Sequence, residues 1–474
     1  APASSTDGER QPVQPRARPP GDARGGAPAR SEGPPGLGAR LAIVLTELRI
    51  SNFKSYGAEQ KLSLAPLTLL VGANASGKSN VIEALALLSW MARGRRLSEL
   101  GYALQQRELH VRGRPETLVA TAGSALQLGA VVDGLELSVG LELSGSGGRI
   151  VSEQLADPSA QTKLPLYRVE RASSEHGSEL SVGYNNFSRG RIKPQIGCVD
   201  TQAVFTQLLT PARFDAEHAE SQRQIPEACT KVADALTSLV MLDPRPDAMR
   251  SYAFAEDRRL FADGSNVSAV LAQLCGDEAA RAEVLRFVRN LPEQDIAGIE
   301  FLRGPRNDVM VELVESFGGK TSKVDATMLS DGTLRVLAIA AALLSVEEGT
   351  LVVIGEIDNG VHPSRARELM RSLEETARRR GLRLLVTTHN PALLDAVPPS
   401  ALGDTVACYR DPATGESRLQ TLREMDDFVA IGAAGPLGML ATSGALDRYL
   451  KRRRSAQVRE AQGQQILELL RSGE

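Results

Sequence analysis

Residues 72–79 read Gly-Ala-Asn-Ala-Ser-Gly-Lys-Ser, and the segments on either side limit how this stretch can fold. The apolar run 67–71 predicts a buried strand before it, and a helical apolar pattern begins at Val81. A glycine-rich loop between a strand and a helix turns its backbone N–H groups towards an anion, and the helix N-terminus adds a favourable dipole. This order of strand, loop and helix predicts a phosphate-binding loop.

The loop predicts that the chain binds a nucleoside triphosphate, ATP, together with Mg²⁺. Lys78 would reach the β- and γ-phosphates, and the Ser79 hydroxyl would hold the metal ion. A chance glycine-rich turn is the alternative, and the strand and helix on either side disfavour it. The other expected nucleotide contacts of the loop are Gly72, Asn74, Ala75, Ser76, Gly77 and Asn80.

The overall composition narrows the classes of partner. The net charge of −3 provides no global basic field, so contact with DNA would need a local basic patch. The four cysteines include no Cys-x-x-Cys pair, which disfavours a zinc site and a disulfide framework and fits a cytoplasmic setting. No uninterrupted apolar run reaches the roughly 18–20 residues of a membrane span. We therefore expect no membrane contact.

Patterning divides the chain into five segments of an α/β protein. Residues 1–43 are rich in Pro, Gly and Arg, which predicts a disordered extension; a basic arm that touches nucleic acid is the alternative. Residues 44–150 predict a first lobe, in which an antiparallel sheet lies beside the phosphate loop. Helical patterns and linking strands fill 151–325. Residues 326–425 alternate helices with buried strands and predict a parallel-sheet lobe, and 426–474 predict a helical tail.

Three motifs of the parallel-sheet lobe lie at strand ends or at a helix start, where ligands bind in such sheets. The buried run 351–354 leads directly into Glu356, and this strand disfavours the alternative of an acidic surface turn. A second buried strand leads into His389, for which a structural role is the usual alternative. The turn Ser330-Asp-Gly332 precedes an apolar helix, and such a turn is common by itself.

In their order and spacing, these motifs resemble ABC-type ATPase heads of the RecF/SMC-like group, often called AAA-21 or AAA-15 proteins. Residues 328–333 are similar to the ABC signature, 351–363 to the Walker B and D-loop segment, and 385–391 to the switch-histidine loop. The opening segment 50–55, Ile-Ser-Asn-Phe-Lys-Ser, is also similar to that of the group. The resemblance covers roughly residues 44–425 and implies a P-loop head made of two lobes.

The resemblance implies a catalytic set of Lys78, Glu356 and His389. His389 would hydrogen-bond the γ-phosphate and sense its hydrolysis. Lys54 and Ser55 in the opening segment would face the nucleotide.

The resemblance also implies that two heads enclose two ATP molecules, so that the chain is a homodimer or higher oligomer through ATP. Ser330 and Gly332 would contact the γ-phosphate held by the second subunit. Residues 150–155 lie where a Q-loop residue is expected, and either Glu153 or Gln154 fills that place. Glu153 would then be a magnesium ligand.

One position departs from the group. Gly355 stands where the Walker B strand normally carries the acid that steadies Mg²⁺. Asp358 could compensate, or Glu356 could serve the metal and the water together. The alternative is that the chain hydrolyses ATP weakly and acts as an ATP-bound scaffold or sensor that holds a partner protein.

Several relatives of this kind are ATPases of anti-phage systems, and others are overcoming-lysogenization-defect (OLD) nucleases with a TOPRIM domain. We expect no TOPRIM domain after His389, so chemistry on nucleic acid would need a separate effector, a nuclease or a toxin. DNA remains a candidate partner, and the basic cluster 448–454 either touches its backbone or is a solvated helix face. Membrane transport is disfavoured.

Overall fold

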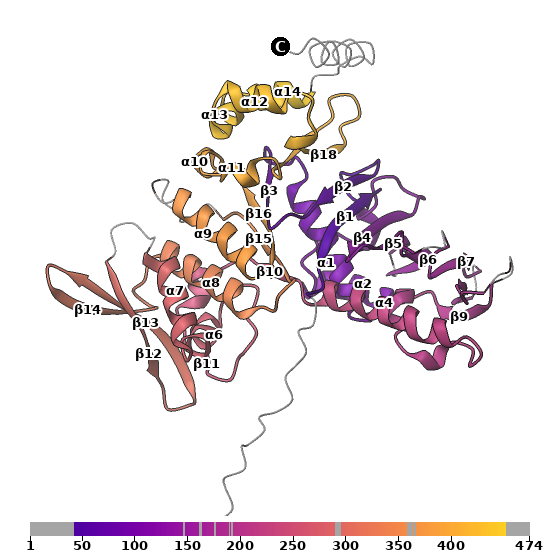
Figure 1. Cartoon of the computed structure of the whole chain (residues 1–474), viewed down its shortest axis with the longest axis horizontal. Coiled ribbons are helices and arrows are strands. Elements are labelled where there is room, and N and C mark those ends of the chain that lie inside the picture. The colour runs from indigo at the N-terminus through magenta and orange to yellow at the C-terminus, as the bar shows by residue number, and fades with distance from the viewer. Residues whose placement is uncertain are drawn as a thin grey trace, which may run out of the picture. The chain divides into compact units, whose positions relative to one another are not determined.

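The computed structural model describes residues 42–145, 147–160, 164–174, 177–188, 190, 193–289, 295–357, 364 and 366–451 (Figure 1). Most of the expected N-terminal extension, the position of Asp358 and the end of the expected tail lie outside these residues. The expected α/β class, with an antiparallel lobe and a parallel-sheet lobe, is confirmed.

A six-stranded sheet forms the centre of the nucleotide-binding lobe. β10, β15, β16, β3 and β17 run parallel in that order, and β18 is antiparallel at the edge. Parallel strands of this kind are buried on both faces, which explains the unbroken apolar runs in β3 and β15. The strands are β10 (Val240–Leu242), β15 (Leu351–Ile354), β16 (Arg383–Thr388), β3 (Leu67–Val71), β17 (Val406–Arg410) and β18 (Ser417–Thr421).

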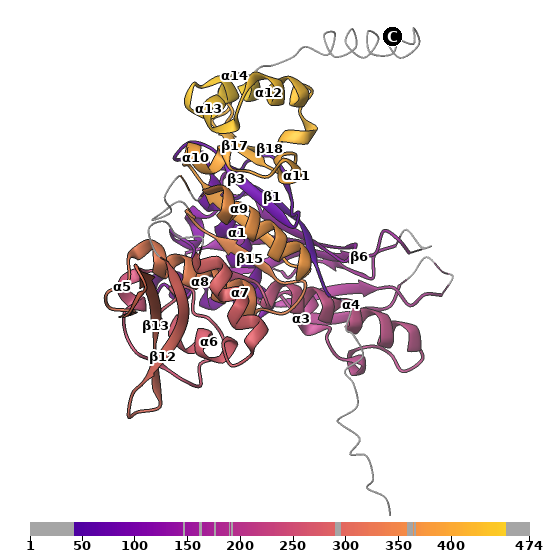
Figure 2. The same cartoon turned by 60° about the vertical axis from the view of Figure 1, so that its left-hand side comes forward.

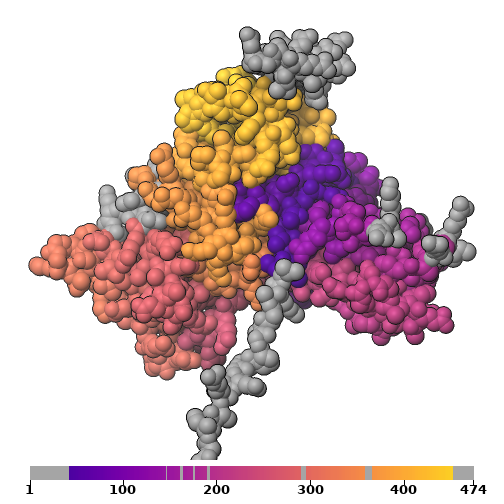
Figure 3. Space-filling view, viewed as in Figure 1, coloured from indigo at the N-terminus to yellow at the C-terminus, as the bar shows by residue number. Residues whose placement is uncertain are grey.

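The register of this sheet brings three strand ends together. Val71 at the end of β3 pairs with Thr388, and Ile354 at the end of β15 pairs with Val386 on the same strand β16. The phosphate loop, Glu356 and His389 therefore start from one edge of one sheet, although they are far apart in sequence. In the space-filling view, the indigo surface of the first segments adjoins the orange and yellow surface of the last ones (Figure 3).

Helices cover this sheet. The apolar helix α8 (Asp331–Ser345) is buried on nearly all sides, and it packs on α6 (Val267–Leu274) and α7 (Glu278–Arg289). α9 (Ala366–Arg379) is amphipathic and contacts β3, as the turned view shows beside the central strands (Figure 2). In the part of the chain that the structure describes, no helix is both long and apolar enough to cross a membrane.

The second sheet has eight antiparallel strands. Its buried apolar side chains form one hydrophobic core with those of α1 (Lys78–Ala92) and α4 (Ala219–Thr237). The alternation over 135–143 is confirmed as a strand, β5. In sheet order the strands are β2 (Gln60–Ser63), β1 (Leu45–Ser51), β4 (Leu126–Val132), β5 (Leu135–Ser144), β6 (Gly147–Ala156), β7 (Tyr167–Arg171), β8 (Glu179–Tyr184) and β9 (Gln195–Val199).

Residues 151–325 contain more strand than the expected helical insertion. β7 to β9 extend the antiparallel sheet, and a third sheet consists of β11 (Ala253–Phe254), β13 (Asp308–Phe317), β12 (Ile296–Arg303) and β14 (Lys320–Asp325). Strands such as β14 are exposed along most of their length, so they lack the apolar alternation that would have revealed them. The segment boundaries themselves stay predictions.

The remaining helices are short. They are α2 (Leu100–Gln105), α3 (Val204–Gln207), α5 (Pro246–Met249), α10 (Pro391–Asp395), α11 (Pro399–Leu402), α12 (Phe428–Ala434), α13 (Leu437–Thr442) and α14 (Ala445–Lys451).

Candidate nucleotide site

Two glycines allow the phosphate loop to curl tightly after β3. Gly72 has φ of +153°, and a Cβ there would lie 2.1 Å from the backbone oxygen of Cys408. Gly77 has φ of +120°, and a Cβ there would lie 2.4 Å from Ser417 Oγ. Both backbone angles favour glycine, so both positions need it for conformation and for space. The loop is thereby fixed against β17 and β18.

Lys78 and Ser79 occupy the first turn of α1, where backbone N–H groups have no partner inside the helix. Lys78 Nζ donates to the backbone oxygens of Gly72 at 2.5 Å and Ala73 at 3.0 Å. The ammonium group is thus folded over the loop. This is the place where the loop would hold the phosphates of a nucleotide.

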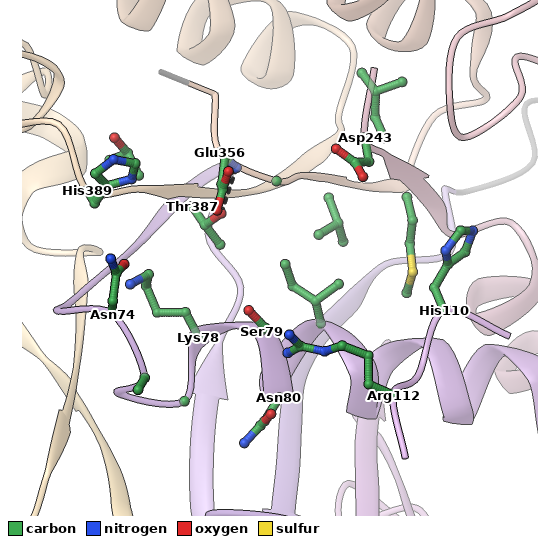
Figure 4. A pocket seen from close by; sticks show the side chains of 18 of the residues that line it. Asn74, Lys78, Ser79, Asn80, His110, Arg112, Asp243, Glu356, Thr387 and His389 are labelled. Carbon is green, nitrogen blue, oxygen red and sulfur yellow. Dashed lines mark hydrogen bonds between the residues drawn. The ribbon is translucent and has the colours of Figure 1, made fainter. Parts of the chain in front are cut away.

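A cavity of about 710 Å³ opens over this loop (Figure 4). It brings together eight of the residues expected at the site, which come from the phosphate loop, α1 and the segments that follow β15 and β16. They are Asn74, Ala75, Gly77, Lys78, Ser79, Asn80, Glu356 and His389. Gly72 and Ser76 belong to the same loop but do not line the cavity, and Ser76 is buried beneath it.

Glu356 lies directly beyond β15, in a strained backbone conformation. Its φ is 45°, a left-handed value that is uncommon for any residue with a side chain. The Glu356 N–H donates to Thr387 Oγ1 at 2.9 Å, and the Ile357 N–H donates to the backbone oxygen of Thr387 at 3.2 Å. Two bonds to β16 therefore hold the strained turn, and such strain gathers at functional sites.

His389 follows β16 on the same edge of the sheet. The next residue, Asn390, donates its N–H to Thr388 Oγ1 at 3.0 Å and caps α10 through its side chain. Figure 4 shows His389 and Glu356 on the strand side of the cavity, facing Lys78 and Asn74 on the loop side. A γ-phosphate on the loop would lie between these two groups.

Lys54 and Ser55 do not line the cavity; they support residues that do. Lys54 forms an ion pair with the buried Glu83 and donates to the Arg112 backbone oxygen at 2.6 Å. Burial lowers the pKa of Lys54. Ser55 Oγ accepts from Asn80 Nδ2 at 2.7 Å. Because the Lys54 ammonium group is paired with Glu83, this geometry does not support a direct contact between Lys54 and a nucleotide.

Glu153 is not brought to the cavity. Its side chain lies in the core, 3% exposed, and accepts from the Tyr167 hydroxyl and from the N–H groups of Val204 and Phe205, each at 2.7 Å. Because the side chain is buried among these three donors and does not line the cavity, we withdraw Glu153 from the expected magnesium site. The sequence could not reveal this burial, because β6 alternates and either face could have been the inner one.

Burial raises the pKa of Glu153 to about 7. Between its unfolded value near 4.5 and about 7, the folded state keeps a proton that the unfolded state releases, so stability falls as pH rises through this window. We expect a fall on the order of 3 kcal/mol from this group between about pH 5 and 8. Urea unfolding at both pH values measures it. In Glu153→Gln, the decrease in unfolding free energy that comes from this group should be absent. A pH dependence of stability equal to that of the wild type would contradict the raised pKa of Glu153.

Ser330 and Gly332 lie at the start of α8 and do not line this cavity either. Ser330 Oγ accepts from the Thr333 N–H at 3.1 Å and so caps the helix. Arg250 holds the preceding turn: it pairs with Asp331 at 2.5 Å and donates to the Leu329 oxygen at 2.6 Å. The turn 328–332 is therefore held by contacts within the chain, and Ser330 and Gly332 are not part of the cavity over the phosphate loop.

Sequence reasoning missed several residues that line the cavity. Arg112 is oriented by Glu83 of α1 at 2.7 Å, and Arg410 at the end of β17 donates to the Ala75 oxygen at 3.0 Å. Asp243 follows β10 and faces the cavity. An acid directly after the apolar run 239–242 was the one available signal for Asp243. His110 and Arg112 lie in an irregular segment without any pattern.

The donors present fit Mg²⁺ bound together with phosphates. Within the described residues, no group of three or more His, Cys, Asp or Glu side chains could hold a metal by itself. The cavity does offer the Ser79 hydroxyl and the carboxylates of Glu356 and Asp243. Mg²⁺ prefers this kind of site, with one or two carboxylates and the rest of its ligands from phosphates and water.

Two family models match the chain. Residues 203–395 match the family described as "AAA domain, putative AbiEii toxin, Type IV TA system", and residues 44–95 match an AAA ATPase domain. Together they include the phosphate loop, the signature turn, Glu356 and His389.

Curated relatives match over shorter stretches. The DNA replication and repair protein RecF of Acaryochloris marina is 43% identical over 69 residues, 14% of this chain and 18% of the relative. RecF of Gloeobacter violaceus is 35% identical over 123 residues, 26% of this chain and 28% of the relative. The match thus spans less than a third of either relative.

The comparison with solved structures found SMC heads. The SMC head domain of Thermotoga maritima gives a TM-score of 0.35 at 13% identity, over 80% of this chain and 98% of that one. The head from Pyrococcus furiosus, bound to the C-terminal domain of ScpA, gives 0.42 at 11% identity, over 82% of this chain and 100% of that one.

Proposed function

Because the chain is a RecF/SMC-like ATPase of the ABC type, we propose that it binds ATP with Mg²⁺ in this cavity and hydrolyses it. One observation carries the proposal: Lys78 and Ser79 on the loop face Glu356 and His389 on two strand ends across a single cavity. A phosphate loop alone would support binding. The acid and the histidine opposite it support a reaction at the γ-phosphate.

Each group has a chemical task in this proposal. Lys78 neutralises charge on the β- and γ-phosphates, and bound Mg²⁺ would add to this neutralisation from the side of Ser79. Glu356 accepts a proton from the attacking water, for which it must be ionised. His389 donates a hydrogen bond to a γ-phosphate oxygen and loses that partner when the phosphate leaves. Steady-state ATP turnover of the purified protein with Mg²⁺ tests the whole assignment.

We further propose that two chains enclose two ATP molecules. Ser330 is exposed at a capped helix start outside its own cavity, so it is available to the γ-phosphate of a partner chain. Gly332 follows it in the buried first turn of α8, where its contribution would be to the backbone conformation of the turn. Each site would then be composite, with the loop from one chain and the signature turn from the other.

Complementation between two inactive variants tests this arrangement. Ser330→Arg is expected to lower turnover at least about 100-fold while leaving ATP binding by the same chain within about twofold, because its own cavity is untouched. Mixing it with Lys78→Ala should restore part of the activity, since one composite site of the mixed dimer is intact. Turnover per chain of each variant and of the mixture is the measurement.

A mixture that stays as inactive as its components would count against composite sites. Losing the helix cap at Ser330 costs roughly 1 kcal/mol, so thermal unfolding of Ser330→Arg should be followed beside it. A larger loss of stability would show that the variant misfolds, and Gly332→Ala then replaces it in the mixture.

We propose that the dimer works in the cytoplasm with a separate effector, a nuclease or toxin, in DNA transactions or phage defence. The names of the RecF relatives support the DNA side of this proposal.

A second cavity of about 400 Å³ adjoins the nucleotide site through His110 and Met241, and Arg93, Arg95 and Arg259 line it. Turnover with and without double-stranded DNA, at two salt concentrations, tests this side of the proposal, because backbone contacts weaken with salt.

The second candidate function is an ATP-bound scaffold with little turnover, and Gly355 favours it. The end of β15 carries no acid at that position. Tight ATP binding by the wild type without turnover, in the presence and absence of DNA, would favour the scaffold over the ATPase.

A further inference from the structure

Gly355 leaves a space in the nucleotide site. It is the first residue after β15 and lines the cavity, and a Cβ built on it would meet no atom within 4 Å. A side chain at this position would therefore project into open room. Glu356 cannot move into that role without cost, because its backbone is held in the left-handed region by bonds to Thr387.

The strand beside β15 supplies an acid at the same level. β10 and β15 are parallel, Leu242 pairs with Ile354, and the Gly355 N–H donates to the Leu242 backbone oxygen at 3.2 Å. Asp243 is therefore the lateral neighbour of Gly355 across the sheet. Adjacent strands lie about 4.8 Å apart, a separation that one aspartate side chain can cover in part.

Asp243 is positioned for a ligand. Its N–H donates to the Ala262 oxygen at 2.8 Å, which fixes its backbone at the cavity wall. Its side chain is exposed and lines the cavity, and Figure 4 shows the carboxylate turned inwards on the strand side, across from Ser79. Among the described residues, no ion pair involves Asp243, whereas Arg112 nearby is already paired with Glu83.

We propose that Asp243 supplies, from the neighbouring strand, the carboxylate that Gly355 lacks, and that it holds Mg²⁺ together with Ser79 and the phosphates of ATP. This inference rests on the proposed function of the cavity as an ATP site. It separates two roles that would otherwise fall on one residue: Asp243 serves the metal, and Glu356 stays available as the base. The chemistry is ordinary for Mg²⁺, which takes one or two carboxylates and completes its shell with phosphate and water.

Binding of a fluorescent ATP analogue, with Mg²⁺ and with EDTA, tests the assignment without relying on turnover. In the wild type, Mg²⁺ should tighten binding. Asp243→Asn should weaken binding at least about tenfold in Mg²⁺ and leave the affinity in EDTA within about twofold. The Mn²⁺ affinity of the ATP complex, read by electron paramagnetic resonance, should fall in parallel. Asp247→Asn, an exposed acid on the following turn, is the matched control and should change neither value.

The double variant Asp243→Asn with Gly355→Asp makes the test sharper. Moving the carboxylate back to β15 should recover most of the Mg²⁺-dependent affinity, which a variant that merely misfolds could not do. If Asp243→Asn keeps the full effect of Mg²⁺, this inference fails while the ATP site stands. If the wild type binds no nucleotide in either buffer, the proposed function itself fails.

Discussion

Replacing Lys78 with alanine is expected to abolish ATP turnover, with a loss of at least about 100- to 1,000-fold. The side chain folds over the phosphate loop through the backbone oxygens of Gly72 and Ala73, so its positive charge lies where the β- and γ-phosphates would bind. Removing it takes away charge stabilisation in both the bound and the reacting state. We therefore expect weaker ATP binding as well as slower turnover, measured by titration and by phosphate release.

Lys61→Ala is the matched control, because Lys61 lies on β2 with a side chain that is 56% exposed and does not line the cavity. Thermal unfolding of both variants without nucleotide should stay close to the wild type, since each truncation removes only partly or largely exposed atoms. Normal turnover in Lys78→Ala would mean that the measured activity comes from a contaminant or from another site.

Glu356→Gln is expected to separate ATP binding from ATP hydrolysis. Glutamine fills the same volume but cannot accept a proton, and loss of a general base costs typically about 10²–10⁴ in rate. ATP binding should be retained, because Lys78 and Ser79 on the opposite wall are untouched. The trapped nucleotide should then hold two chains together, which light scattering after size exclusion detects with ATP and not with ADP.

The comparison with Glu348→Gln controls for loss of an acidic side chain, because Glu348 precedes β15 at its other end. Equal turnover in Glu356→Gln and the wild type would remove Glu356 as the base. The wild type and Glu356→Gln could both hydrolyse ATP only at the rate of a protein-free solution. That result would favour the ATP-bound scaffold, and we would then expect the wild type to dimerise with ATP.

The sequence was sufficient for the nucleotide lobe because its elements are locally determined. A strand, a glycine loop and a helix predict one another over residues 67–92, and the apolar runs before Glu356 and His389 predict buried parallel strands. Parallel strands align their carboxyl ends, so the strand assignment places these groups at one edge of the sheet. That they also lie side by side depends on the strand order β15, β16, β3.

Other features depend on contacts that no local pattern encodes. Lys54 forms an ion pair with Glu83, which lies 29 positions later in the sequence. Glu153 accepts hydrogen bonds from the N–H groups of Val204 and Phe205, about 50 positions later. Asp243 follows a strand of only three residues, too short to show a period. The role that we propose for it rests on the pairing of β10 with β15, which places it beside Gly355.

The segment after Asp243 connects the cavity to the turn before α8. Seven residues beyond this carboxylate, Arg250 holds Asp331 and three backbone oxygens in the turn before α8, those of Ala326, Thr327 and Leu329. The segment 243–250 therefore joins the proposed metal ligand to the turn that we propose for contact with a second chain. In the proposed dimer, this short connection would place the metal site of one chain next to the composite site of the other.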